Sequence, residues 1–364
     1  MVDWISSASK MMGAVNQTWD SAKHHVNQKL GIQDAIHILP YRGYGTAAQL
    51  WLKGRVLQNE DIALREKDDP IWKNALNMYR RFETDEIPGV QIRASVGNQQ
   101  CCITTNKEGF FEVEIDLQQR PDSLWQPVQL EILTDDYPIS SQKVQGEAII
   151  VSEKTRFGVI SDIDDTVVRT AATDLFKMIR IAYLGNEQTR QPFAGVASFY
   201  HALQRGSTGQ ASNPIFYVSS SAWNMYDLFD KFMSINNIPK GPILLRDIEL
   251  SPENLLSFEH SSHKLEQICP VLEQFSELPF ILIGDTGQQD AEIYRTLAQN
   301  YPDRILAIYL RDVVPDNRDR TAQLSEIGDS LQQQGIPFLV FAKTSAAVEH
   351  AADHGWVLPR LPFE

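Results

Sequence analysis

Three aspartates follow a short apolar run whose β-branched residues are typical of a buried strand. The run covers residues 157–161 (FGVIS), and the aspartates are Asp162, Asp164 and Asp165. In an open α/β sheet, ligands bind outside the carboxyl ends of the strands. Carboxylates this close repel one another unless a cation lies among them, and Mg²⁺ is the usual cation where phosphate is also bound. A helix N-terminus, which also favours Asp, is the alternative that this cluster alone leaves open.

Three later features are compatible with the same chemistry. A second apolar run, residues 215–218, ends in the hydroxyl of Ser219, and Lys264 begins a helical stretch. A third run, FILIG, is followed by a turn that carries Asp285 and Asp290. Taken singly, these are a strand end, a solvated lysine and a capped turn. Because the carboxyl ends of parallel strands meet at one edge of a sheet, we expect the features to converge there and to perform phosphoryl transfer.

The second half of the chain has the alternating pattern of an α/β domain. Apolar runs alternate with helical stretches from residue 155 onward, which favours a parallel sheet with helices on both faces. The expected strands are 158–161, 215–219, 279–284, 305–310 and 337–342, and the expected helices are 224–235, 264–275, 289–300 and 321–334. Residues 167–213 are long for one crossover, so we expect them to form a small cap over the strand ends.

The first half of the chain divides into two further segments. Residues 1–35 have the spacing of an amphipathic helix, which either lies on a membrane surface or packs on the body of the protein. Residues 36–152 alternate at period two between turn signals, which predicts an antiparallel β-sandwich with a helical insertion near 63–81. The α/β catalytic domain then covers residues 153–364.

Composition limits the classes of partner. The net charge of −14 argues against a broad nucleic-acid-binding face, although a local basic patch remains compatible with it. The cysteines Cys101, Cys102 and Cys269 have no metal-ligand spacing, which favours a reducing, cytoplasmic setting. We therefore expect a cytoplasmic protein without a nucleic-acid partner, with peripheral association at a membrane left open.

In this order, the four features resemble the haloacid dehalogenase-like (HAD) phosphatase superfamily over roughly residues 155–342. A narrower resemblance is to the catalytic domain of actin-patch-type phosphatidate phosphatases and their bacterial relatives. It is carried by the segments DIDDT, YVSSSAWNMYDLF, IPKGPILLRD, HK and GDTGQQD. Members of that family typically have Ser-Pro-Trp where this chain has Ser221-Ala222-Trp223, a departure beside the site. The resemblance implies a HAD-like, Rossmannoid doubly wound sheet with a small cap.

The resemblance also implies a Mg²⁺-dependent phosphatase with an aspartyl-phosphate intermediate. Asp162 would be the nucleophile, and Asp164 would protonate the leaving oxygen and then activate water. Asp162, the backbone carbonyl of Asp164, and Asp285 would hold Mg²⁺, while Asp290 would complete or orient that shell. Ser219 and Lys264 would bind the phosphoryl group. The residues expected to bind the substrate are Thr166, which also braces the loop of the aspartates, Ser220, Arg190 and Arg246.

The substrate implied by the family is phosphatidate, which would be converted to diacylglycerol and phosphate. The expected cap interleaves basic and apolar residues, which suits a phospholipid headgroup at an interface, although a packed helix with solvated arginines has the same pattern. A phosphatase for a small soluble phosphomonoester is the alternative enzyme. A non-catalytic scaffold that binds a membrane or a protein is the third possibility, and the intact set Asp162, Asp164, Lys264 and Asp285 speaks against it.

Overall fold

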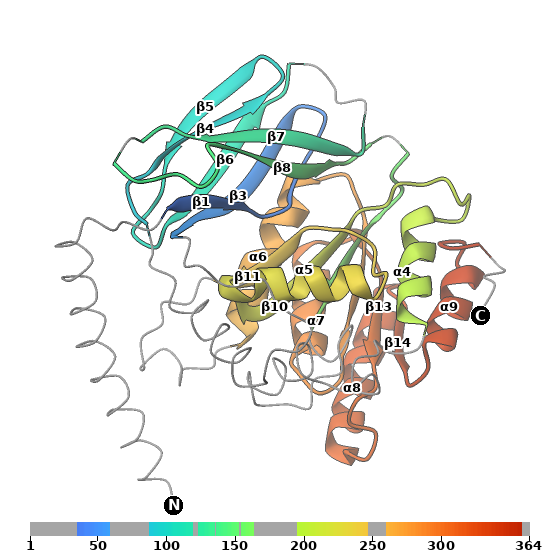
Figure 1. Cartoon of the computed structure of the whole chain (residues 1–364). Helices are drawn as coiled ribbons and strands as arrows, with labels where there is room; N and C mark the ends of the chain where they lie inside the picture. The colour runs from blue at the N-terminus through green and yellow to red at the C-terminus, as the bar shows by residue number, and fades with distance from the viewer. Residues whose placement is uncertain are drawn as a thin grey trace, which may run out of the picture.

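The computed structural model describes residues 35–58, 87–118, 123–134, 136–152, 154–163, 195–246 and 260–358. These residues form a β-rich domain that packs on an α/β domain (Figure 1). The expected N-terminal helix, apart from its last residue, and the expected insertion near 63–81 lie outside the described residues. The same holds for residues 167–194 of the expected cap.

The α/β domain is built on six parallel strands, which confirms the expected α/β class with a parallel sheet. They are β9 (Gly158–Asp162), β10 (Ile215–Ala222), β11 (Ile243–Arg246), β12 (Phe280–Asp285), β13 (Ile305–Arg311) and β14 (Phe338–Phe341). Their order is β11-β10-β9-β12-β13-β14, so the first strand in sequence lies beside the fourth. This is the order of a doubly wound sheet, and the two halves meet between β9 and β12. Ligands bind at this switch point in such sheets, so the topology itself selects the ends of β9 and β12.

Helices cover both faces of the parallel sheet. The helices α4 (Val196–Arg205), α5 (Tyr226–Ile235) and α9 (Thr344–Asp353) pack on one face. The other face is covered by α6 (His260–Gln274), α7 (Asp290–Asn300) and α8 (Arg318–Gln332). A 3₁₀ turn, η2 (Trp223–Met225), joins β10 to α5. In the described part of the chain, no helix combines the length and the apolar character needed to cross a membrane.

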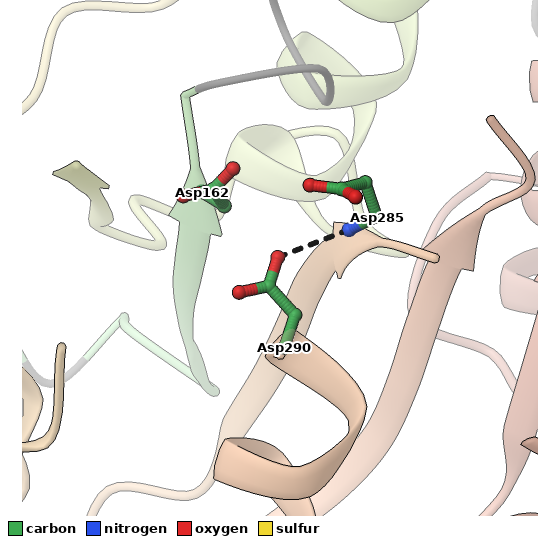
Figure 2. A group of neighbouring side chains, drawn as sticks. All are labelled: Asp162, Asp285 and Asp290. Carbon is green, nitrogen blue, oxygen red and sulfur yellow. Dashed lines mark hydrogen bonds between the residues drawn. The ribbon is translucent and has the colours of Figure 1, made fainter. Parts of the chain in front are cut away.

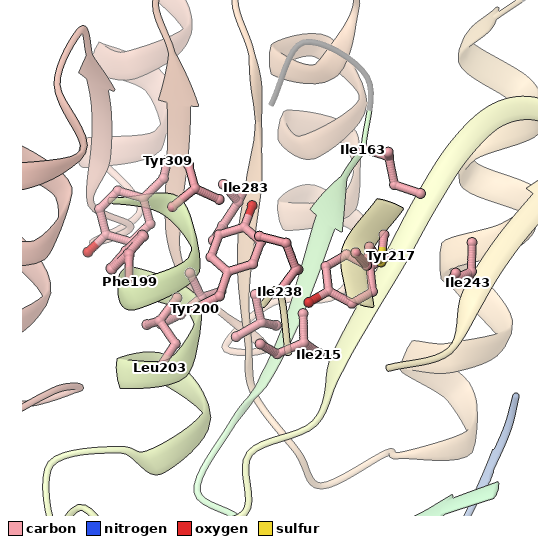
Figure 3. Packing of buried hydrophobic residues seen from close by; sticks show 14 of the residues in the cluster. Ile163, Phe199, Tyr200, Leu203, Ile215, Tyr217, Ile238, Ile243, Ile283 and Tyr309 are labelled. Carbon is pink, nitrogen blue, oxygen red and sulfur yellow. The ribbon is translucent and has the colours of Figure 1, made fainter. Parts of the chain in front are cut away.

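Alternate residues of each strand face opposite helix layers, as the period of a strand requires. Tyr217 of β10 packs beneath α4, while its neighbour Phe216 enters the opposite core. Figure 3 shows Phe199 and Tyr200 of α4 against strand residues of the first face. The helix α4 therefore corrects the expected cap: residues 196–205 were included in that cap, but they cover the sheet instead.

The N-terminal domain is one mixed sheet rather than the purely antiparallel sandwich that was expected. Its strands are β1 (Ile36–Pro40), β2 (Gly43–Gly45), β3 (Gln49–Gln58), β4 (Gln91–Val96), β5 (Gln99–Thr104), β6 (Phe110–Asp116), β7 (Trp125–Ile132) and β8 (Lys143–Ile150). The order is β1-β3-β2-β8-β7-β4-β5, with β6 also paired to β3. The pair β2–β8 is parallel, and the other pairs are antiparallel. The sheet curls so that β5 contacts β6 around a shared apolar core.

Aromatic side chains join the two domains. Tyr41 stacks on Trp223 with ring centroids 4.5 Å apart, and Tyr44 packs edge-on against Phe216 at 5.5 Å. Between these contacts, the backbone N–H of Arg42 donates to the hydroxyl of Tyr226 over 2.8 Å. The Arg42 guanidinium also forms an ion pair with Asp230 of α5. Residues 41–44, which lead from the end of β1 into β2, thus join the β-rich domain to the α/β domain.

Candidate active site

Three carboxylates meet at the switch point of the parallel sheet. Asp162 is the last residue of β9, Asp285 is the last residue of β12, and Asp290 begins α7. One carboxylate oxygen from each lies within 4.8 Å of the others, and all three residues are fully buried. Figure 2 shows the three side chains pointing toward one another across the gap between the strands. The structure therefore brings together three of the four residues expected to bind a metal.

The turn after β12 is shaped to hold its two aspartates. A Cβ atom at Gly284 would lie 2.4 Å from Oδ2 of Asp290, so only glycine lets this carboxylate approach the strand. Oδ2 of Asp290 accepts a hydrogen bond of 3.1 Å from the backbone N–H of Asp285 (Figure 2). Oδ1 of Asp285 accepts bonds of 2.6 and 2.9 Å from the N–H groups of Gly287 and Gln288. Backbone donors thus fix the orientation of both carboxylates before any ligand binds.

Lys264 of α6 supplies the cation of the cluster. Its Nζ lies 2.7 Å from Oδ1 of Asp162 and also forms an ion pair with Asp290. Burial alone would lower the pKa of Lys264, but the charges of Asp162 and Asp290 outweigh burial and raise it. Lys264 therefore stays protonated between the two carboxylates. The structure thus brings Lys264 into the cluster, and its role in binding phosphate stays a prediction.

The charges of the cluster fit a divalent cation. Three carboxylates face one ammonium group, so the fully ionised site carries two uncompensated negative charges in a region closed to solvent. Burial and the charge of Asp290 raise the pKa of Asp285 to about 7, against the opposing effects of Lys264 and the two backbone donors. Oδ2 of Asp285 is buried and has no hydrogen-bond partner among the described residues. An oxygen-only donor set with an unused carboxylate oxygen is what Mg²⁺ binds in proteins.

The expected serine hydroxyls lie on the strand next to Asp162. Val218 of β10 is paired in register with Asp162, so Ser219 lies one residue beyond the nucleophile candidate. Its buried Oγ accepts a 3.0 Å hydrogen bond from the N–H of Ser221. Ser220 Oγ is buried without a hydrogen-bond partner among the described residues. Ser219 and Ser220 therefore follow directly after the residue that pairs with Asp162 on the neighbouring strand.

The remaining expected residues are not brought to the cluster by the described structure. Arg246 ends β11, which is separated from β9 by β10, so its side chain belongs to a neighbouring region of the same edge. Asp164, Thr166 and Arg190 lie outside the described residues, and their roles remain predictions.

Two arginines at this edge were not anticipated from the sequence. Arg320 of α8 donates through Nε to the carbonyl of Thr286 over 2.8 Å and through Nη2 to the carbonyl of Gln288 over 2.6 Å. The same guanidinium pairs with Glu292 of α7. Arg320 thereby clamps the turn that orients Asp285. Arg311, buried at the end of β13 in register with Asp285, donates to Thr344 over 3.1 Å.

A comparison with protein families matches the part of the chain that carries this cluster. Residues 157–312 match the family model described as "Phosphatidate phosphatase APP1, catalytic domain". This segment is therefore similar to a phosphatase catalytic domain. It contains β9, β12 and the four clustered residues, and it ends at the residue after β13. The expected resemblance to phosphatidate phosphatases is supported, while membership of the HAD superfamily stays a prediction.

Two relatives extend the comparison. The chain is 34% identical over 155 residues to phosphatidate phosphatase APP1 of Saccharomyces cerevisiae, a stretch that covers 42% of this chain and 25% of that protein. It is 25% identical over 266 residues to an uncharacterised protein of Schizosaccharomyces pombe, which covers 70% of this chain and 42% of that protein. The chain thus spans between a quarter and two fifths of the length of these relatives. A solved carbohydrate acetylesterase from Xanthomonas citri aligns over 86% of this chain and 72% of its own at 11% identity, with a TM-score of 0.36, too low to bear on the fold.

Proposed function

We propose that this chain is a Mg²⁺-dependent phosphatase that hydrolyses phosphatidate through a phosphorylated Asp162. The observation that carries the proposal is the buried cluster of Asp162, Asp285, Asp290 and Lys264 at the switch point of the sheet. This cluster lies inside the segment that matches the phosphatidate phosphatase catalytic domain. Site geometry and similarity therefore support the same reaction class independently.

The side chains of the cluster have complementary tasks in this reaction. Asp162, Asp285 and Asp290 would hold the metal, and a bound Mg²⁺ would neutralise charge between the carboxylates and the phosphate dianion. A carboxylate oxygen of Asp162 would attack phosphorus as the ester P–O bond breaks, and the leaving alkoxide would take up a proton, a task that the sequence assigns to Asp164. Water would then attack the phosphorus of the aspartyl phosphate, which releases inorganic phosphate and restores the carboxylate. Lys264 would remain protonated throughout as a fixed positive charge beside Asp162.

Fixed donors and a dry site make this arrangement suited to phosphoryl transfer. The reaction depends on positioning and on charge stabilisation more than on covalent chemistry by the protein. The carboxylate of Asp285 is already oriented by two backbone N–H groups, and Asp290 is oriented by a third. The hydroxyls of Ser219 and Ser220, on the strand beside Asp162, would donate to the phosphoryl oxygens.

A substrate screen tests the proposal. Purified protein would be incubated with dioctanoyl phosphatidate in mixed micelles, and with a panel of sugar and nucleotide phosphates, in Mg²⁺ or in EDTA. We expect phosphate release from phosphatidate that requires Mg²⁺ and exceeds release from every soluble phosphomonoester. Preferential hydrolysis of a soluble ester would select the small-molecule alternative. Absence of turnover on all esters in Mg²⁺ would contradict a phosphatase of either kind.

A further inference from the structure

A cavity of about 440 Å³ lies between the two domains, along the β11 edge of the parallel sheet. The β-rich domain contributes Tyr44, Trp51 and Lys53, and the α/β domain contributes Trp223, Arg246, His263 and Gln267. Arg246 is the last residue of β11, and His263 directly precedes Lys264 on α6. The cavity therefore reaches the same edge of the sheet that carries the carboxylate cluster.

The separation between the cavity and the cluster is short. Arg246 lies two strands from Asp162, because β10 stands between β11 and β9. At the usual spacing of adjacent strands this is roughly 10 Å across the sheet, and the register places Arg246 two residues further along the sheet than Asp162. Since about nine bonds of extended chain span 10 Å, the leaving group of a phosphate ester bound at Asp162 approaches Arg246 if it is extended toward the cavity. A volume of about 440 Å³ is within the usual range for small-molecule sites, so the leaving group has room there.

The cavity presents buried polar atoms that have no hydrogen-bond partner in the described part of the chain. Arg246 Nε and Gln267 Oε1 are both buried, and neither has a hydrogen-bond partner among the residues that the structure describes. Both line this cavity, and Gln267 lies one helical turn after His263 on the same side of α6. Buried polar groups are nearly always satisfied in proteins, so two such groups in one cavity indicate a ligand with polar atoms.

The charges around the cavity disfavour a second phosphate. Glu112, Glu114 and Glu266 also line it, and all three are exposed. Lys53 pairs with Glu112 at 3.3 Å, and His263 pairs with Glu266 at 3.2 Å. A dianion would gain little here, since Arg246 is the one lining cation without an ion pair among the described residues. An uncharged group with carbonyl acceptors satisfies Arg246 without meeting this acidic rim.

The apolar part of the wall is aromatic and comes from both domains. The rings of Trp51, Tyr44 and Trp223 line the cavity, and the Tyr44 and Trp51 rings are tilted against each other at 5.0 Å. Lys53 Nζ lies 5.0 Å from the centroid of Trp223 and therefore ties the two walls together. Flat rings of this kind contact C–H groups over a large area at little cost in side-chain entropy.

We propose that this cavity binds the leaving-group portion of the substrate, an uncharged glycerol backbone with ester carbonyls and their first methylene groups. The inference rests on the proposed phosphatidate phosphatase function. Arg246 donates a hydrogen bond to an ester carbonyl. The Gln267 amide has nearly the same shape when it is turned by 180°, so its NH₂ group can take the place of Oε1 and donate a second hydrogen bond. The aromatic walls contact the glycerol and the adjacent methylene groups. The β-rich domain is therefore part of the substrate site, through Trp51 and Tyr44.

The proposal is tested by a ratio of two activities of the full chain. For each variant, kcat/KM is measured with dioctanoyl phosphatidate, which has the ester carbonyls, and with p-nitrophenyl phosphate, which lacks them. We expect Gln267→Leu and Trp51→Ala each to lower the ratio of phosphatidate to p-nitrophenyl phosphate activity about tenfold, the usual effect of one lost hydrogen bond or ring contact. Gln299→Leu, an exposed residue on α7, is the matched control and should keep the wild-type ratio.

A second measurement, product inhibition, keeps the proposal testable if one of the variants folds poorly. Dihexanoylglycerol is added to the wild type and to Gln267→Leu, and inhibition of p-nitrophenyl phosphate hydrolysis is recorded. We expect competitive inhibition that is about tenfold weaker in Gln267→Leu. The inference is overturned if the wild type hydrolyses phosphatidate, both variants keep its activity ratio, and Gln267→Leu keeps its inhibition constant. If the wild type hydrolyses no phosphate ester in Mg²⁺, the proposed function fails, and this inference fails with it.

Discussion

Replacement of Arg320 by Gln tests whether the turn after β12 needs the hydrogen bonds from Arg320 to keep its conformation. The guanidinium donates to the carbonyls of Thr286 and Gln288 over 2.8 and 2.6 Å and pairs with Glu292. Hydrogen bonds from a charged donor contribute about 1.5–3 kcal/mol each, and water will replace part of what is lost. We therefore expect the free energy of unfolding to fall by roughly 2–4 kcal/mol.

The larger consequence concerns the metal site. The turn that Arg320 clamps also provides the two N–H donors that orient Asp285. Loss of a residue that orients a metal ligand typically weakens metal binding about 10–100-fold, and we expect that range for Mg²⁺ in Arg320→Gln. Arg320→Lys keeps the charge but has no fork to reach both carbonyls, so its Mg²⁺ affinity should be intermediate.

Calorimetric titration of Mg²⁺ measures the affinity directly, and urea unfolding in EDTA measures stability separately. Arg318→Gln is the matched control, because Arg318 lies exposed at the start of the same helix. Wild-type Mg²⁺ affinity in a folded Arg320→Gln protein would refute the idea that the clamp positions Asp285. A loss of stability alone would then leave Arg320 with a purely structural role.

Three further changes probe the packing of the site and of the domains. Gly284→Ala places a Cβ 2.4 Å from Oδ2 of Asp290. We therefore expect the free energy of unfolding, measured in urea, to fall by about 1–3 kcal/mol and Mg²⁺ binding to weaken. Lys264→Met leaves the buried Asp162 and Asp290 without their cation, which should lower stability by about 3–5 kcal/mol in EDTA; a melting temperature equal to wild type there would contradict the charge argument. Tyr41→Ala removes the ring stacked on Trp223 and should lower the free energy of unfolding by about 2–4 kcal/mol. Calorimetry should then show the β-rich domain unfolding at a lower temperature.

The site was predictable where its residues lie at strand ends. Asp162 and Asp285 each close an apolar run, and the rule that ligands bind beyond the carboxyl ends of parallel strands brings them together. Asp290 follows from its spacing to Asp285 in one turn. Arg320 could not be found in this way, because its partners are backbone carbonyls, which every residue carries. The sequence gives a weak indication of Arg311, because a charged residue at the end of the apolar run ILAIYLR is unusual.

The fold was predictable in the α/β half and less so in the β-rich half. The four expected helices correspond to α5, α6, α7 and α8 within a few residues, whereas α9 and the four-residue strand β11 were missed. In the β-rich domain, period-two alternation identifies strands but carries no information on which strands pair or in which direction. The three-residue strand β2 is too short for that pattern, yet its parallel pairing with β8 makes the sheet mixed. The cavity between the domains likewise arises from side chains distant in sequence, which no local pattern groups together.

The most direct test of the account is phosphate release from phosphatidate by Asp162→Asn in saturating Mg²⁺. The exchange keeps the shape of the side chain but removes the nucleophilic carboxylate, while Asp316→Asn, at an exposed turn, controls for the chemistry of the change. We predict that Asp162→Asn binds Mg²⁺ more weakly, remains folded by circular dichroism, and releases no phosphate above background, while the control matches the wild type. Wild-type turnover by Asp162→Asn would contradict the assignment of the buried cluster as the catalytic centre.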